Sequence, residues 1–180
     1  SLVLETGQGT FRSSEQMPPV EVSRALVTLD DVQLEVSAPD ATMTLVSGKV
    51  IGLKAGKLVS SNVLAEPSDA TVTFKAQSDA MAVAELIGRP PISLIDERGL
   101  PFKSMDGRVE AQMSLAFPMK AHLVPSEIKT TGVARLKDGR IHKLLGEYDV
   151  QGASIGLDFN NAAVEAKGEA IVRGVLARVS

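Results

Sequence analysis

The stretch from Val109 to Pro118, VEAQMSLAFP in one-letter code, decides the fold. Apolar side chains occupy every second position of it from Val109 to Phe117, and Glu110, Gln112 and Ser114 stand between them. Successive side chains of a β-strand point to opposite faces, so this spacing predicts a strand with one dry face and one mostly wet face. Pro118 then lacks the N–H that the next rung of a ladder needs.

The same alternation recurs along the chain, in 32–36, 71–76 and 164–173. Turn signals separate such runs at intervals of about ten residues, which is the spacing of an antiparallel meander. These signals are Asp30-Asp31, Pro39-Asp40, Ser47-Gly48, Ala55-Gly56, Asp106-Gly107, Asp138-Gly139 and Asn160-Asn161. We therefore expect a mainly β protein made of short antiparallel strands, arranged as a curved sheet or an open groove.

One short helix is predicted near 79–87, because Ser78-Asp79 can cap its first turn and Gly88 with Pro90-Pro91 can end it. A second, weaker helical turn is predicted at 92–96. The stretches 26–76 and 133–179 each have the pattern of about four strands. The expected organisation is a β module at 1–77, a short helix and proline-rich link at 78–105, and a second β module at 106–180.

Composition limits the classes of partner. The net charge is −3, aromatic residues make up 3%, and cysteine is absent. Nucleic acid is therefore an unsuitable partner, and disulfides, thiolate metal sites and cysteine nucleophiles are excluded. No run approaches the roughly 18 apolar residues of a membrane span. Because the chain opens and closes in strand-like sequence, we expect it to be a segment of a longer protein.

Motifs that could carry chemistry lack the context that they need. Gly152-Ala153-Ser154-Ile155-Gly156 matches G-x-S-x-G, but strand-like sequence follows it and no histidine lies downstream. His122 and His142 have no second ligand at metal-binding spacing, and Gly7-Gln8-Gly9-Thr10 lacks the third glycine of a phosphate loop. Asp30-Asp31, Asp96-Glu97 and Glu66 with Asp69 fit solvated turns. We expect no catalytic residue, no metal and no cofactor.

The remaining question is what the apolar faces do. Two sheets or a closed barrel would bury them as core, and the chain would then be a structural or adaptor module whose edge strands pair with neighbouring segments. A single open sheet would leave a contiguous apolar surface, which usually marks a binding site. Spacing alone leaves both alternatives open.

A family resemblance bears on this choice. Pro90 to Leu94, Gly99-Leu100-Pro101, Asp106 to Ala111 and Leu115 to Met119 follow one another in an order that resembles AsmA-like proteins of the YhdP and TamB type. Thr131 to Leu136 and Val164 to Ala170 look like the recurring strands of that family. The likeness covers Pro90 to Val179 well, and the first half of the chain only by pattern.

The resemblance implies a non-enzymatic segment of a periplasmic protein that takes part in phospholipid transport and outer-membrane biogenesis. It also implies an inner-membrane anchor outside this segment. Under this hypothesis an apolar lining contacts phospholipid acyl chains, with neighbouring segments of the same chain as further partners. The expected lining residues are Val109, Met113, Leu115, Phe117, Ile155, Leu157, Phe159, Val164 and Val172.

Overall fold

The computed structural model describes residues 1–12, 17–87, 103–120, 123–144 and 147–179. Its strands are β1 (Leu2–Thr6), β2 (Gly9–Phe11), β3 (Val20–Val22), β4 (Ala25–Asp30), β5 (Gln33–Thr44), β6 (Val50–Ser60), β7 (Ser68–Asp79), β8 (Ser104–Met119), β9 (Lys129–Leu144), β10 (Tyr148–Asn160), β11 (Val164–Val172) and β12 (Val175–Val179). The helical elements are α1 (Ala80–Ile87) and the short 3-10 helix η1 (Pro125–Glu127).

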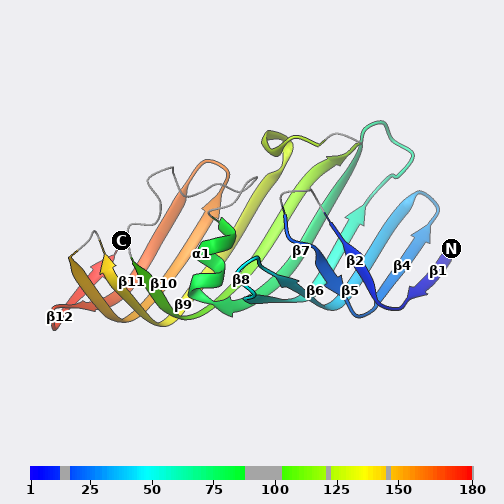
Figure 1. Cartoon of the computed structure of the whole chain (residues 1–180). Coiled ribbons are helices and arrows are strands. Elements are labelled where there is room, and N and C mark those ends of the chain that lie inside the picture. Colours follow the sequence, from blue (N-terminus) through cyan, green and yellow to red (C-terminus); the bar gives the residue numbers. More distant parts are fainter. Residues whose placement is uncertain (13–16, 88–102, 121–122, 145–146, 180) are drawn as a thin grey trace.

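All twelve strands belong to one antiparallel sheet, which runs β1-β4-β5-β6-β7-β8-β9-β10-β11-β12, while β3 pairs with both β2 and β5. β1 and β12 stand at opposite ends of this order, so the sheet is open (Figure 1). The expected mainly β, antiparallel meander with one short helix is confirmed. β7 pairs with β8 from Ser68 opposite Met119 to Asp79 opposite Arg108, so the strands of 1–77 and 106–180 form one continuous sheet.

The strands are longer than the sequence suggested, because four of the seven expected turns lie inside strands. Pro39-Asp40 lies in β5, Ala55-Gly56 in β6, Asp106-Gly107 in β8 and Asp138-Gly139 in β9. Asp30-Asp31, Ser47-Gly48 and Asn160-Asn161 do connect strands, as expected. Three of the wrong assignments share a cause, since Ala55, Gly107 and Asp138 have the positive φ that suits a bulge within a strand as well as a tight hairpin. Pro39-Asp40 differs, because it has no positive φ and lies where β5 pairs with β6 without a register shift.

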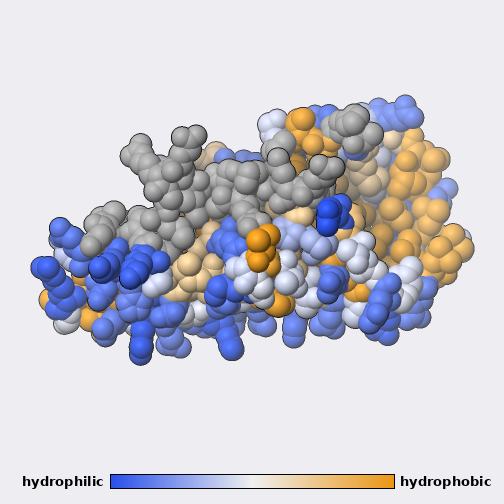
Figure 2. All heavy atoms as spheres, viewed as in Figure 1, coloured by the Kyte–Doolittle hydropathy of each residue, from blue (hydrophilic) through white to orange (hydrophobic). Residues whose placement is uncertain are grey.

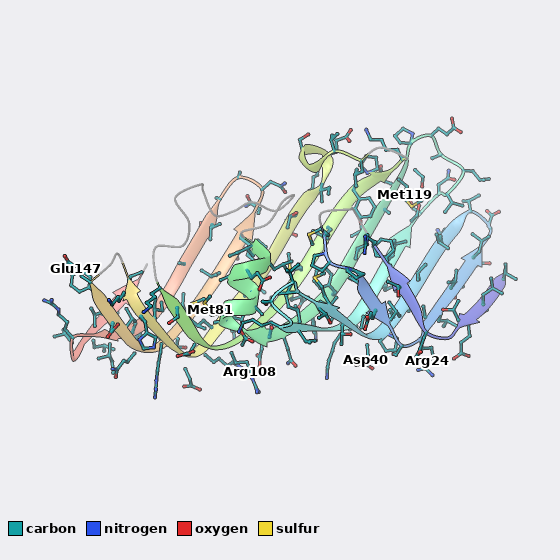
Figure 3. All side chains as sticks on the ribbon, in the orientation of Figure 1. Arg24, Asp40, Met81, Arg108, Met119 and Glu147 are labelled. Carbon is teal, nitrogen blue, oxygen red and sulfur yellow. The ribbon has the colours of Figure 1, made fainter. Side chains whose placement is uncertain are left out.

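These internal positions form lines of bends across the sheet. Ala55, Asp138 and Gly152 have φ of 51°, 51° and 58°, and Gly107 has φ of 122°. Register shifts accompany them, between Lys54 and Lys57 in β6 and between Asp106 and Arg108 in β8. Bulges bend a strand and increase its twist. The sheet curves at this level, and Figure 3 shows Arg24, Asp40 and Arg108 along its lower edge.

α1 begins where β7 ends, and the predicted cap is confirmed. Asp79 Oδ1 accepts a hydrogen bond from the Ala82 N–H at 2.8 Å, which satisfies one of the free donors of the first turn. The helix lies on one face of the sheet (Figure 1). The predicted stop at Gly88 and Pro90-Pro91, the proline-rich link and the weak helical turn at 92–96 lie outside the described residues.

Two clusters of buried apolar residues lie around α1. The first joins Ala80 to residues of β8 to β11, including Val109, Leu136 and Val150. The second joins Ala82 to Met43, Leu45 and Ile51 at the ends of β5 and β6. The core is therefore gathered around one helix rather than between two sheets.

Candidate functional site: the apolar face of the sheet

The cross-strand register brings all nine predicted lining residues to one face of the sheet. Residues directly opposite each other in an antiparallel pair share a face. Val109 lies opposite Leu136, and Leu136 lies opposite Ile155. Gly132 connects Met113 with Phe159 in the same way. We call this face, on which Ala80 of α1 packs, the apolar face.

The nine residues divide into two groups. Val109 is 7% exposed and belongs to the cluster around Ala80, and Ile155 and Val172 pack against that cluster. Met113, Leu115, Phe117, Leu157 and Phe159 are half-buried, and Val164 is 57% exposed. The first group lies in a zone that α1 covers, whereas the second group lies beyond it.

The second group continues into the N-terminal half of the sheet, where sequence reasoning named no lining residue. Phe74 lies opposite Met113, and Val72 lies opposite both Leu115 and Leu58. From there the register leads through Val36 and Val27 to Leu4 of β1. We call the whole set the open strip. It consists of Leu2, Leu4, Val27, Leu29, Leu34, Val36, Leu58, Ser60, Ala70, Val72, Phe74, Met113, Leu115, Phe117, Thr130, Gly132, Leu157, Phe159, Val164 and Ala166.

No member of the open strip, as defined from the described residues, carries a charge. The strip crosses nine strands, which at about 4.8 Å per strand gives a length of roughly 40 Å. Figure 2 shows apolar residues exposed at the end of the molecule formed by the N-terminal strands, where Leu2 and Leu4 are 53% and 52% exposed. A surface of this kind binds apolar groups through their area and supplies few directional contacts.

The ring of Phe159 packs closely against Gly132 in the open strip. A Cβ placed on Gly132 would lie 2.6 Å from Phe159 Cζ and 2.8 Å from the Gln112 carbonyl oxygen. The absence of a side chain at Gly132 therefore lets the aromatic ring cover β9. The sequence showed both residues but not their register, because β9 and β10 shift relative to each other at three places before these positions pair.

The opposite face carries charged pairs. Lys137 Nζ donates to Glu110 Oε2 at 2.7 Å, and Lys57 Nζ lies 3.0 Å from Glu35 Oε1. The hydrogen bond from Lys137 lowers the pKa of Glu110, and the hydrogen bond from Lys57 lowers the pKa of Glu35. Both carboxylates are thus held ionised towards solvent, as suits the wet side of a one-sided sheet.

The other sequence motifs occupy ordinary strand positions. Gly152 to Gly156 lies inside β10 at a bulge, rather than at a strand-to-helix turn. His142 is near two exposed aspartates, with Nε2 3.5 Å from Asp106 Oδ2 and Nδ1 3.7 Å from Asp149 Oδ1. Among the described residues no group of three or more His, Cys, Asp or Glu side chains is arranged to hold a metal. His122 and Asp96-Glu97 lie outside those residues.

Comparison with known proteins adds no relative: no protein-family model, curated protein or solved structure matches this chain. In the part of the chain that the structure describes, no helix has the length and apolar character needed to cross a membrane. Fold and surface together define the class as an open antiparallel β-sheet protein with one apolar and one charged face.

Proposed function

We propose that this chain is a non-enzymatic segment of a periplasmic AsmA-like protein, in which the open strip lies along the path of phospholipid acyl chains. The parent protein would be anchored in the inner membrane outside this segment, and would serve phospholipid transport and outer-membrane biogenesis. The observation that carries the proposal is the uncharged strip that crosses nine strands and is half-buried or exposed at all of its residues except the buried Ser60 and Ala70.

The dimensions and chemistry of the strip support an acyl ligand. Its length of roughly 40 Å exceeds one leaflet of a bilayer, which is about half of a 30 Å hydrocarbon core. Each methylene that leaves water contributes about 0.8 kcal/mol without needing a hydrogen-bond partner. A strip that lacks charge and reaches the edge strand β1 suits a ligand that slides, because no single position holds it strongly.

A structural or adaptor module is the second candidate, and one observation favours it. The two buried clusters around α1 show that part of the apolar face already serves as core. If something other than lipid covers the open strip in the parent protein, the whole face has a structural role.

Site-specific photo-crosslinking in living cells separates the two candidates. A photoreactive residue is placed at Met113, on the apolar face. In a matched variant it is placed at Gln112, the residue directly before Met113 in β8, which points to the charged face. Phospholipid recovered from Met113 and not from Gln112, identified by mass spectrometry, supports the lipid path. Recovery of protein adducts alone from Met113 would favour the structural module and reject the proposal.

A further inference from the structure

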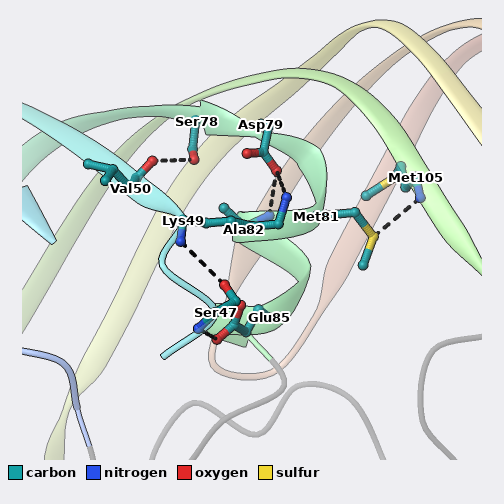
Figure 4. A network of polar contacts seen from close by, with 9 residues as sticks. All are labelled: Ser47, Lys49, Val50, Ser78, Asp79, Met81, Ala82, Glu85 and Met105. Carbon is teal, nitrogen blue, oxygen red and sulfur yellow. Dashed lines mark hydrogen bonds and ion pairs between the residues drawn. The ribbon is translucent and has the colours of Figure 1, made fainter. Parts of the chain in front are cut away.

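β1 and β12 end the main path of the sheet and lie at opposite ends of the molecule (Figure 1). Among the strands that the structure describes, each pairs on one side alone, β1 with β4 and β12 with β11. Their outer N–H and C=O groups are therefore free to pair with another strand. Polar groups beside α1 differ, because they have partners within the chain: Asp79 pairs with Lys49 at 3.3 Å, and the Ser78 hydroxyl donates to the Val50 carbonyl oxygen at 2.9 Å (Figure 4).

The directions of the strands allow the two edges to join. The main path has ten strands, which are the twelve of the sheet less β2 and β3. Neighbours along this path are all antiparallel, so the first strand, β1, and the tenth, β12, run in opposite directions. A second copy of the chain, placed beside the first in the same orientation, therefore presents its β1 antiparallel to β12, with both apolar faces on the same side.

The two edges also match in length and in register, since β1 and β12 have five residues each. Leu4 belongs to the open strip, and Ala177 lies opposite the buried Ala170, so both are on the apolar face. Pairing over all five residues aligns like faces, whereas a slip by one residue would set the apolar face against the charged face. This full pairing opposes Val3 to Arg178, Leu4 to Ala177 and Glu5 to Leu176.

The charged faces of the two edges complement each other. Arg24 Nη1 lies 3.7 Å from Glu5 Oε1 at one edge, and Arg178 Nε lies 3.0 Å from Glu169 Oε1 at the other. In the full pairing Glu5 and Arg178 are diagonal neighbours, which long side chains can bridge. The charges then alternate in sign across the junction. Exposed ion pairs add little affinity, but they select between partners.

Apolar contact at the junction supplies the affinity. Val3 and Leu176 are 56% and 59% exposed and become diagonal neighbours on the charged face. Leu4 and Val175 are 52% and 68% exposed and become diagonal neighbours on the apolar face. All four side chains lose contact with water when the edges join, which favours association.

Pairing of like edges lacks this complementarity. Two β1 strands that pair over all five residues bring Glu5 of one copy diagonal to Glu5 of the other. Two β12 strands do the same with Arg178. Like charges at neighbouring cross-strand positions repel each other, so the side chains favour the pairing of unlike edges.

We infer that β12 of one chain pairs with β1 of a second copy, so that copies join head to tail into one extended antiparallel sheet. The two surfaces that meet are different, and such a heterologous interface continues into a filament or closes into a ring. The apolar faces of successive copies lie on one side of the assembly. This inference goes beyond the proposed function and does not depend on it.

Two substitutions on the charged face test the pairing. Val3→Lys places a cation opposite Arg178, and Leu176→Glu places an anion opposite Glu5. We expect each to raise the dissociation constant of the full chain about fivefold, the factor of a strong cross-strand pair, as measured by sedimentation equilibrium. An equimolar mixture of the two variants should recover association, because the unchanged β12 of the Val3→Lys chain meets the unchanged β1 of the Leu176→Glu chain.

The matched controls are Val133→Lys and Val133→Glu, because Val133 is 49% exposed on the same face but lies in the interior strand β9. Both should leave the dissociation constant unchanged. Pairing of like edges predicts the opposite sign for the edge variants, since it sets Val3 against Glu5 and Leu176 against Arg178.

Three results would overturn the inference. The first is stronger association of the Val3→Lys or the Leu176→Glu chain, which indicates pairing of like edges. The second is an equal weakening by the Val133 variants, which indicates association through the charged face. The third is an unaltered chain that stays monomeric up to its limit of solubility.

Discussion

At the scale of single residues, Gly132 is the position where the open strip is most sensitive to added volume. Gly132→Ala would bring a methyl group against the Phe159 ring and the Gln112 carbonyl oxygen. We expect a loss of about 1–3 kcal/mol in the free energy of unfolding, as for other overpacked sites. Urea denaturation measures it.

Gly52→Ala is the matched control, because a Cβ at Gly52 would meet only the Gln77 carbonyl oxygen, at an ordinary 3.6 Å. Removal of a strand glycine there should be neutral or stabilising by up to about 1 kcal/mol. Equal losses in the free energy of unfolding of both variants would show that Phe159 does not pack tightly against Gly132.

Glu110 offers a second test at this scale, on the charged face. Its pKa is lowered by the hydrogen bond from Lys137, so the pair stabilises the fold above the ordinary glutamate pKa and loses that contribution as pH falls through the lowered value. Lys137→Met should raise the pKa of Glu110, which a carboxyl NMR titration follows. The pKa of Glu127, which Lys120 lowers, should stay unchanged in this variant; a parallel shift would indicate a general change of fold.

At the scale of elements, the bends decide how much of the structure could be predicted. The alternation from Val109 to Phe117 predicted β8 and its dry face, because side-chain direction follows from strand geometry alone. The spacing of the turn signals predicted the antiparallel arrangement. The turn signals could not separate a hairpin from a bulge, since Ala55 and Asp138 adopt in mid-strand the same positive φ that a hairpin would use. The helix was predicted with its cap, but not the burial of Ala82 on its second side.

Because bulges shift the register between strands, the pairing of distant strands could not be predicted either. The open strip joins Leu4 to Val164 through eight successive registers, and one shift by a single residue would move a strand's apolar side chains to the other face. The nine residues named from the sequence came from β8, β10 and β11, where alternation is longest.

A further prediction concerns the bend in β8 at Gly107 and its effect on stability. Gly107 has φ of 122°, a conformation that only glycine adopts readily, and a Cβ there would lie 3.0 Å from Gly139 Cα. We expect Gly107→Ala to lower the free energy of unfolding by about 1–3 kcal/mol. Gly152→Ala should cost less, about 1 kcal/mol, because φ of 58° lies in the left-handed region and nothing is closer than 3.9 Å. Thermal denaturation ranks the two variants, and a reversed order would contradict the bend as a constraint on β8.

At the scale of the whole molecule, an open sheet leaves two edges with unpaired backbone groups, and here both edges are apolar. In β1, Leu2, Val3 and Leu4 are 53%, 56% and 52% exposed, and in β12, Val175 and Leu176 are 68% and 59% exposed. Interior strands of the sheet place such residues mainly on one face. Exposed apolar edges pair readily with further strands.

This arrangement predicts that the isolated chain associates through its edges. Leu4→Lys with Val175→Lys should reduce the weight-average mass at high protein concentration, because lysine on an edge opposes pairing with another strand. Sedimentation velocity measures the change. Val133→Lys is the matched control, since Val133 is 49% exposed but lies in the interior strand β9. If Val133→Lys reduced association as much as the edge variant, the association would follow from apolar area in general, and the edges would have no special part in it.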